Sequence, residues 1–154
     1  MMDSVAKNVE RDTHYRSIIH AQRNEPEQTV ADAISAAART VAETHNVPAI
    51  VCYTGTGSTG LRVARERPHM PILSLTPIAH TARKLCLVWG THTVLTEDAQ
   101  SVDEMFERAG EIAFREGFAK PGDRILITAG VPVGTPGTTN MLRVVTVGAD
   151  GKGY

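Results

Sequence analysis

Residues 47–68 read VPAIVCYTGTGSTGLRVARERP, and this stretch decides the fold of the chain. The first seven residues form an apolar run typical of a short buried strand, and the glycines and hydroxyl residues that follow are typical of a loop. From Leu61 the pattern predicts a helix that ends by Pro68. A helix that starts directly after such a loop points unpaired backbone N–H groups and the positive end of its dipole at one place. The loop is therefore suited to binding a phosphate.

The spacing of the loop residues leaves three interpretations open. Residues 55–60 fit the dinucleotide pattern G-x-G-x-x-G, but that pattern needs an acidic residue about 20 positions later, and the next strand ends at Thr76 without one. Leu61 replaces the lysine of a Walker loop, and Thr56 replaces the first glycine of a nucleophile elbow around Ser58, so neither of those sites is favoured. A site for one phosphate is the favoured interpretation. A plain turn capped by threonine and serine is the alternative, and a dinucleotide site comes third.

Composition indicates one domain with a substantial core. Of 154 residues, 42% are hydrophobic and 5% aromatic, so the core is expected to consist mostly of Ala, Val, Ile and Leu. The net charge is −1, there is no basic run, and no apolar stretch approaches the roughly 20 residues of a membrane span. The start of the chain has no signal-peptide character. We therefore expect a cytoplasmic protein with neither nucleic acid nor membrane as a partner.

The cysteines and histidines do not form a metal-binding pattern. Cys52 and Cys86 lie in apolar surroundings without C-x-x-C spacing, so both are predicted to be buried, reduced thiols, which fits a reducing cytosol. The six histidines are scattered, with no pair at i,i+4. We expect no metal and no cofactor in this chain.

Strands alternate with helices along most of the chain. Capping boxes at Thr29 and Ser101 predict two helix starts, and Thr76 before Pro77 predicts a third. Further strands are predicted at residues 71–75, 91–95, 124–128 and 141–147. Strands alternating with helices of this length form βαβ units. The predicted fold class is α/β, a three-layer sandwich with a five-stranded, mainly parallel sheet of order 3-2-1-4-5, its last strand antiparallel, and helices on both faces.

The connection before the last strand contains no helix. Residues 129–140 are rich in Gly, Pro and Thr and are too short for a crossover, so the strand at 141–147 is predicted to be antiparallel and at an edge. An edge strand must be covered or paired, and we expect a subunit contact through Leu142, Arg143, Val144 and Val145. The alternative is an ordinary edge shielded by Arg143 and the polar tail at 150–154. In this strand order, the loops at 54–59 and 131–140 face each other across one crevice.

The N-terminal residues precede the alternation of strands and helices and differ from it. Residues 1–11 predict a helix whose start is not capped, and residues 12–28 are polar and predict a connecting segment. A helix without a beginning suggests that the chain was cut from something longer.

The motifs, taken in order, resemble the C-terminal domain of pyruvate kinase. They are TVADAI at 29–34, TGTGST at 54–59 before VARERP at 63–68, PILSLT at 71–76, KPGD at 120–123 and GTTN at 137–140. The resemblance covers residues 29–147, so residues 29–154 are assigned to this domain. Residues 1–28 resemble the last helix of the catalytic barrel and the connection out of it.

The resemblance implies a regulatory role within a homotetramer. It implies that phosphoryl transfer from phosphoenolpyruvate to ADP, with Mg and K as cofactors, belongs to a barrel that this chain lacks. The chain alone, with no catalytic residue and no metal ligand, is expected to be inactive. Two other functions are weighed beside an effector-binding domain. One is a purely structural oligomerisation domain, and the other is a small dinucleotide-binding protein.

Carried over by position, the resemblance implies an effector site on two loops. The phosphate would bind Thr54, Gly55, Thr56, Gly57, Ser58 and Thr59, and the closing loop would be Gly134, Thr135, Pro136, Gly137 and Thr138. Gly55 replaces a lysine of the members activated by fructose 1,6-bisphosphate, and residues 96–106 offer carboxylates instead of an arginine. AMP or a sugar monophosphate is therefore favoured as the effector. Four basic residues are either helpers of this site or a solvated surface, namely Arg62, Arg65, Arg83 and Lys84.

Overall fold

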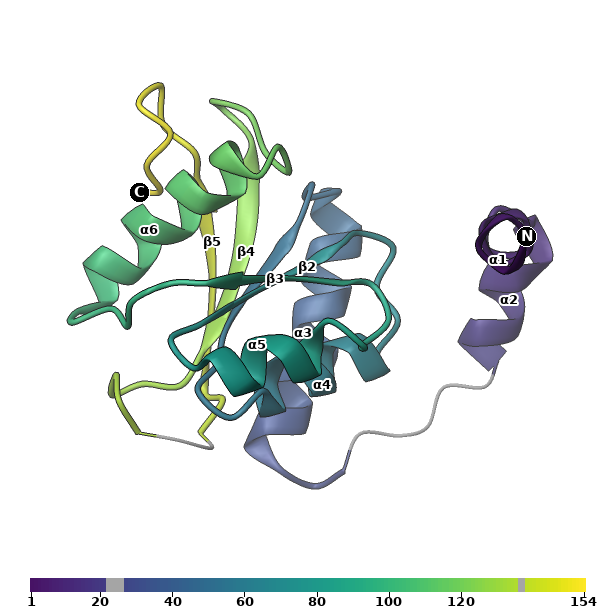
Figure 1. Cartoon of the computed structure of the whole chain (residues 1–154), viewed down its shortest axis with the longest axis horizontal. Coiled ribbons are helices and arrows are strands. Elements are labelled where there is room, and N and C mark those ends of the chain that lie inside the picture. Colours follow the sequence, from purple (N-terminus) through teal and green to yellow (C-terminus); the bar gives the residue numbers. More distant parts are fainter. Residues whose placement is uncertain (22–26, 136–137) are drawn as a thin grey trace.

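A five-stranded sheet forms the centre of the molecule (Figure 1). The computed structural model describes residues 1–21, 27–135 and 138–154. The sheet has the order β3-β2-β1-β4-β5, in which the first four strands along the chain are parallel and β5 is antiparallel to β4. The strands are β1 (Ile50–Tyr53), β2 (Ile72–Thr76), β3 (Thr91–Leu95), β4 (Arg124–Ala129) and β5 (Met141–Thr146). The predicted strand order, the antiparallel last strand and the α/β class are confirmed.

Helices cover both faces of the sheet. The helices of the described ranges are α1 (Met2–Glu10), α2 (Thr13–Ala21), α3 (Val30–His45), α4 (Ser58–Arg65), α5 (Ala79–Leu85) and α6 (Val102–Arg115). One core lies between the sheet and α6, and a second lies between the sheet and the pair α3 and α4. The alternating side chains of β1 enter both cores, Val51 and Tyr53 towards α6, and Ile50 and Cys52 towards α3 and α4. This is why the run around β1 is apolar throughout.

Two of the three predicted helix caps are present. Thr29 and Ser101 accept hydrogen bonds from the backbone N–H groups of Asp32 and Glu104. The third prediction is wrong, because α5 begins only at Ala79 and its N-cap residue makes no side-chain hydrogen bond. Thr76 is instead the last residue of β2, and its hydroxyl accepts a bond from the Ile78 N–H at 3.3 Å. The threonine therefore closes a turn before the helix.

The N-terminal residues form two helices at one side of the sheet (Figure 1). Residues 13–21 are helical rather than a connecting segment, because Asp12 accepts a bond from the His14 N–H at 2.8 Å and caps this helix. No residue of α1 is buried, and Val5, Val9 and Ile18 are each more than half exposed. Within the described ranges, no helix is both long enough and apolar enough to cross a membrane.

The C-terminal tail continues the sheet beyond β5. Thr146 and Tyr154 exchange two backbone hydrogen bonds of 3.0 Å each, and Val147 forms an antiparallel bridge with Gly153. The tail also crosses α6 at Gly110, where a Cβ atom would lie 2.2 Å from the backbone nitrogen of Gly153. This contact fixes the tail against the helix.

The two cysteines differ in exposure. Cys52 is fully buried in β1, as predicted, and burial raises the pKa of its thiol far above the usual value. Cys86 is exposed, so its predicted burial is wrong. The helix α5 ends at Leu85, and Cys86 is the residue after its last turn, where the chain leaves the core.

Candidate functional site

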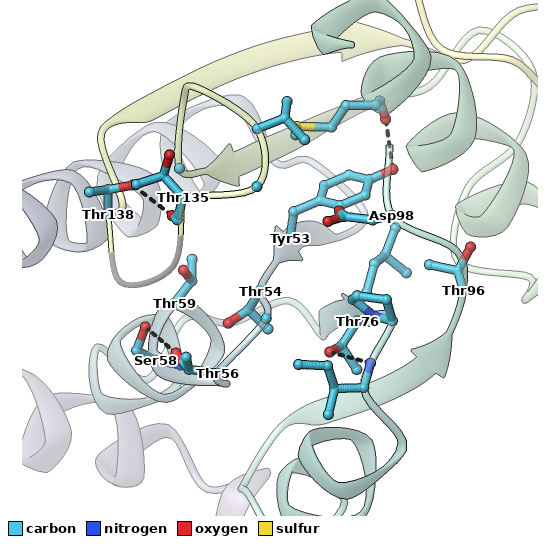
Figure 2. A pocket seen from close by; sticks show the side chains of 18 of the residues that line it. Tyr53, Thr54, Thr56, Ser58, Thr59, Thr76, Thr96, Asp98, Thr135 and Thr138 are labelled. Carbon is cyan, nitrogen blue, oxygen red and sulfur yellow. Dashed lines mark hydrogen bonds between the residues drawn. The ribbon is translucent and has the colours of Figure 1, made fainter. Parts of the chain in front are cut away.

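A pocket of about 180 Å³ lies at the carboxyl ends of β1, β2 and β3 (Figure 2). Its walls come from the loop before α4, the segment after β3, and the loop between β4 and β5. Because β1 lies between β2 and β4, this is the point at which the winding of the sheet reverses. The predicted crevice between the loops at 54–59 and 131–140 is therefore present.

The first loop contributes hydroxyl groups and backbone amides. Thr54, Gly55, Thr56, Ser58 and Thr59 line the pocket. The backbone N–H of the remaining predicted residue, Gly57, donates to the Thr54 hydroxyl at 2.8 Å. The Ser58 N–H lies 3.4 Å from the Thr56 hydroxyl, which itself donates to the Ser58 hydroxyl at 3.1 Å. These two amides are thus bonded to side-chain hydroxyls, which can rotate away, rather than to backbone carbonyls.

Two glycines of the motif at 55–60 are required by the fold, one by its backbone conformation and one, in α4, by packing. Gly57 has φ +90°, a conformation that favours glycine, and a Cβ atom on Gly60 would lie 2.8 Å from the Ser74 hydroxyl oxygen. The third, Gly55, has no atom within 4 Å of a Cβ position. A side chain at position 55 would therefore meet open space.

The second loop closes the opposite wall. Gly134, Thr135 and Thr138 line the pocket, whereas Pro136 and Gly137 lie outside the described residues. The base of the loop is fixed by Asn140, whose side chain accepts a bond from the Val131 N–H at 2.8 Å and donates to the Val131 carbonyl at 2.6 Å.

One hydrogen bond joins the two loops directly. The hydroxyl oxygens of Thr59 and Thr139 lie 2.8 Å apart, and both residues are buried. They are 80 positions apart in the sequence, so the bond ties the start of α4 to the far end of the second loop. The relative position of the two walls is thereby fixed.

The basic residues of α4 do not reach the pocket. Arg65 and Arg62 form ion pairs with Asp32, the Arg62 pair at 3.5 Å. The hydrogen bond from the Thr29 hydroxyl and the charges of these arginines hold the pKa of the buried Asp32 carboxyl below its usual value. Arg62 and Arg65 therefore link α4 to α3. Two other predicted helpers, Arg83 and Lys84, are exposed on α5, outside the lining of the pocket.

The charged residues that do line the pocket are acidic. Among the described residues, its lining contains no Lys, Arg or His, and its charged members are Glu97 and Asp98. The nearby guanidinium of Arg108 bonds to the Glu97 backbone carbonyl and to the Glu104 carboxylate. Arg108 therefore already has hydrogen-bond partners next to the pocket.

Three further lining residues, which the sequence pattern did not indicate, lie at the ends of strands. Tyr53 ends β1, and Thr76 and Thr96 stand at the ends of β2 and β3, all within the lining. The Tyr53 hydroxyl donates to the Met105 carbonyl at 2.8 Å, and burial raises the pKa of this phenol. The signal was available, since the last residues of adjacent parallel strands share one edge of the sheet.

The four predicted interface residues on β5 have different environments. Val144 is 39% exposed, whereas Val145 is 1% exposed and lies in the core against α6. Leu142 packs against the other core, and the Arg143 guanidinium lies 4.9 Å from the centre of the Phe106 ring. Val144 is thus the apolar side chain of this group that faces outward.

The described residues offer no ready metal site. No group of three or more His, Cys, Asp or Glu side chains within them could hold a metal ion.

Comparisons with known proteins agree on one family. A family model described as "Pyruvate kinase, alpha/beta domain" matches residues 32–145. The chain is 50% identical over 146 residues to a pyruvate kinase of Methylorubrum extorquens, an alignment that covers 95% of this chain and 30% of that protein. It is 37% identical over 155 residues to a pyruvate kinase of Staphylococcus haemolyticus, covering 99% and 26% of the two chains. For a pyruvate kinase of Geobacillus stearothermophilus the identity is 38% over 143 residues, covering 93% and 24%. The chain thus spans about a quarter to a third of the length of these relatives.

Proposed function

The chain belongs to the family of the pyruvate kinase alpha/beta domain, the C-terminal domain of these enzymes. From this membership we propose that it is a regulatory domain that binds a phosphorylated effector. The parent enzyme would transfer phosphate from phosphoenolpyruvate to ADP on a separate catalytic barrel, which would also hold Mg and K. The chain alone would be inactive. Binding in the pocket would be communicated to that barrel through the parent protein.

One observation carries the proposal. Two loops rich in glycine and hydroxyl groups line one pocket at the switch point of the sheet, and the Thr59–Thr139 bond holds them together. A phosphate at the start of α4 would replace the Thr54 and Thr56 hydroxyls as the acceptor for the Gly57 and Ser58 amides. The positive end of the α4 dipole would stabilise its charge.

The charge of the lining favours one phosphate over two. A phosphate without a basic side chain can be held by amides and hydroxyls at a helix start, but the described lining offers one such place. A second phosphate would extend towards Glu97 and Asp98. AMP or a sugar monophosphate is therefore a better effector than fructose 1,6-bisphosphate.

Titration calorimetry and thermal unfolding test this function. We expect AMP or a sugar monophosphate to release or absorb heat on binding and to raise the melting temperature, because a ligand at 100 times its Kd adds about 2.7 kcal/mol to the free energy of unfolding. The variant Ser58→Asp places a carboxylate where the phosphate would bind and should abolish both effects. Thr40→Asp, on the exposed face of α3, is the matched control and should leave both effects intact. No binding of any monophosphate at millimolar concentration would refute the proposal.

A second role, in subunit assembly, is supported by the edge of the sheet. β5 pairs with β4 on one side, and on its other side the backbone bonds found within the described residues are those between Tyr154 and Thr146. The rest of that edge, with Val144 facing outward, would pair with a second copy of the chain.

Sedimentation, which measures the oligomeric state of the chain in solution, tests this second role. We expect dimers that Val144→Lys converts to monomers, whereas Val30→Lys, at a valine 67% exposed on α3, should leave the dimer intact. Val145 is not a usable test position, since a lysine there would enter the core. A monomeric unmodified chain would count against assembly while leaving effector binding untouched.

We further propose that residues 1–28 belong to the domain that precedes this one in the parent enzyme. The support is the exposed apolar side of α1 and α2, including Val5, Val9 and Ile18. Deletion of residues 1–21 should change the melting temperature of the remainder little, because no residue of α1 is buried and the described side chains of α2 are exposed or half-buried. The fluorescence of Trp89 should change, since its indole N–H donates to Glu10 at 2.7 Å. A drop of several degrees on deletion would show that these helices belong to this domain.

A further inference from the structure

The two sides of the pocket differ in chemical character. Figure 2 shows Thr56 and Ser58 on one side and Asp98 and Thr96 on the other. The first side offers hydroxyls and backbone amides, which suit a phosphate. The second offers the carboxylates of Glu97 and Asp98, which repel a phosphate and attract a positive charge or a hydrogen-bond donor. A ligand that reaches across the pocket must match both sides.

The two carboxylates are available to a ligand. Among the described residues, neither Glu97 nor Asp98 forms an ion pair. The nearby Arg108 guanidinium is engaged by the Glu97 backbone carbonyl and by the Glu104 carboxylate. Both carboxylates, which belong to residues that line the pocket, therefore keep their acceptor capacity for a ligand.

The floor between the two sides carries hydroxyl donors. Thr54 and Thr76 are adjacent on neighbouring strands, as the pairing of Tyr53 with Leu75 requires, and both are buried. Each hydroxyl oxygen accepts a backbone N–H, from Gly57 at 2.8 Å and from Ile78 at 3.3 Å. Among the described residues, neither hydroxyl donates its own proton, so the hydroxyl groups of a sugar would accept these protons.

The pocket lacks a platform for a nucleotide base. Tyr53 is the one aromatic residue in the described lining, and it is 8% exposed with its hydroxyl directed to the Met105 carbonyl. Bases are usually held by stacking on an exposed aromatic face. A sugar, with hydroxyl groups around its ring, fits this lining better than adenine.

We propose that the pocket selects an amino sugar monophosphate, whose phosphate binds at the start of α4 and whose ammonium group binds Glu97 and Asp98. This inference rests on the function proposed above and narrows it from monophosphates in general to one chemical class. The carboxylates also exclude a second phosphate. One charge pair at about 4 Å in water changes affinity about fivefold, so we expect at least that preference over the neutral sugar.

Titration calorimetry on the full chain at neutral pH tests the selection. The probes are glucosamine 6-phosphate, glucose 6-phosphate, fructose 1,6-bisphosphate and glucosamine. We expect glucosamine 6-phosphate to bind at least about fivefold more tightly than glucose 6-phosphate, and the bisphosphate to bind most weakly of the three phosphates. Glucosamine alone should not bind measurably, because it lacks the phosphate.

Charge-neutral variants identify the residues responsible. The double variant Glu97→Gln/Asp98→Asn should remove the preference for the amine and strengthen bisphosphate binding at least about fivefold. The matched control Glu111→Gln/Asp103→Asn removes two charges from exposed positions of α6 outside the pocket lining and should change neither affinity. Equal affinity for the two sugar monophosphates, or an unchanged preference in the double variant, overturns this inference alone. If no phosphate compound binds, the proposed function fails as well.

Discussion

The substitution Gly110→Ala sets two physical effects of opposite sign against each other. In an exposed helix interior, alanine is favoured over glycine by about 1 kcal/mol, so helix propensity predicts a more stable protein. The tail predicts the reverse, because the new Cβ atom would lie 2.2 Å from the backbone nitrogen of Gly153. Gly153 cannot move closer to α6, because it already packs tightly there: a Cβ atom built on Gly153 would lie 2.2 Å from the Phe106 carbonyl oxygen. The tail must therefore move away by roughly 1 Å to reach a normal contact distance.

The cost follows from the bonds that the tail would lose. The two backbone bonds between Thr146 and Tyr154 contribute about 1 kcal/mol each, and the bond from the Gly153 N–H to the Glu107 carbonyl is already long at 3.4 Å. A loss of about 2 kcal/mol exceeds the gain of about 1 kcal/mol in helix propensity. The net expectation is that Gly110→Ala lowers the free energy of unfolding by about 1 kcal/mol.

Urea unfolding of four proteins, which together form a double-mutant cycle, measures the coupling between residue 110 and the C-terminal tail. The members are the chain, Gly110→Ala, a deletion of residues 148–154, and the two changes combined. In the deleted chain the clash is absent, so Gly110→Ala should there stabilise by about 1 kcal/mol, and the sign of its effect should reverse. The lowering in the full chain corresponds to a fall in melting temperature of about 2 to 4 °C. If Gly110→Ala stabilises the full chain, the tail does not pack on α6 and the reasoning is refuted.

Two further predictions concern single side chains. Asp32→Asn should lower the free energy of unfolding at pH 7 by about 1.5 to 3 kcal/mol, because Arg62 and Arg65 lose a charged acceptor. The pKa of Asp32 is lowered in the folded state, so its contribution to the free energy of unfolding is complete above the unfolded pKa of about 3.9 and is lost as the pH falls further. Urea unfolding should therefore show a smaller difference in stability between the two proteins at pH 3 than at pH 7. An equal difference at both pH values would contradict this. A thiol reagent at neutral pH should modify one cysteine, the exposed Cys86, in the folded chain and two after denaturation; rapid modification of both in the folded chain would contradict the burial of Cys52.

Much of the fold follows from the alternation of apolar strands and capped helices. The apolar run at β1 and the helix-free connection before β5 together require a central parallel strand and an antiparallel edge, and the structure has both. The starts of α2 and α5 were missed because each depends on one short side chain. Asp12 begins a helix in a polar stretch, and Thr76 completes β2 instead of capping a helix. Such local competition is decided by neighbouring elements, which the sequence pattern does not contain.

The composition of the site was predictable, but its charges were not. Loop residues 54–59 lie at the pocket because a βαβ unit brings them to the carboxyl edge of the sheet. The direction of Arg62 and Arg65 could not be read from their spacing, since the proposed phosphate site and Asp32 both lie near α4. The buried Asp32 takes them because a carboxylate removed from water needs opposite charge. Arg62 and Arg65 are therefore not available to a second phosphate in the pocket.

The three glycines of the motif at 55–60 bear differently on the plain turn and on the proposed binding site. A turn that only connects β1 to α4 requires Gly57, for its positive φ, and Gly60, for its contact with Ser74. It gives no reason for glycine at position 55, where the backbone φ is not positive and a side chain would meet no atom within 4 Å. The proposed site gives a reason, because Gly55 lines the pocket and leaves that part of its wall without a side chain. The glycines of the motif at positions 57 and 60 are thus explained by the fold, whereas Gly55 is left to the proposed phosphate site.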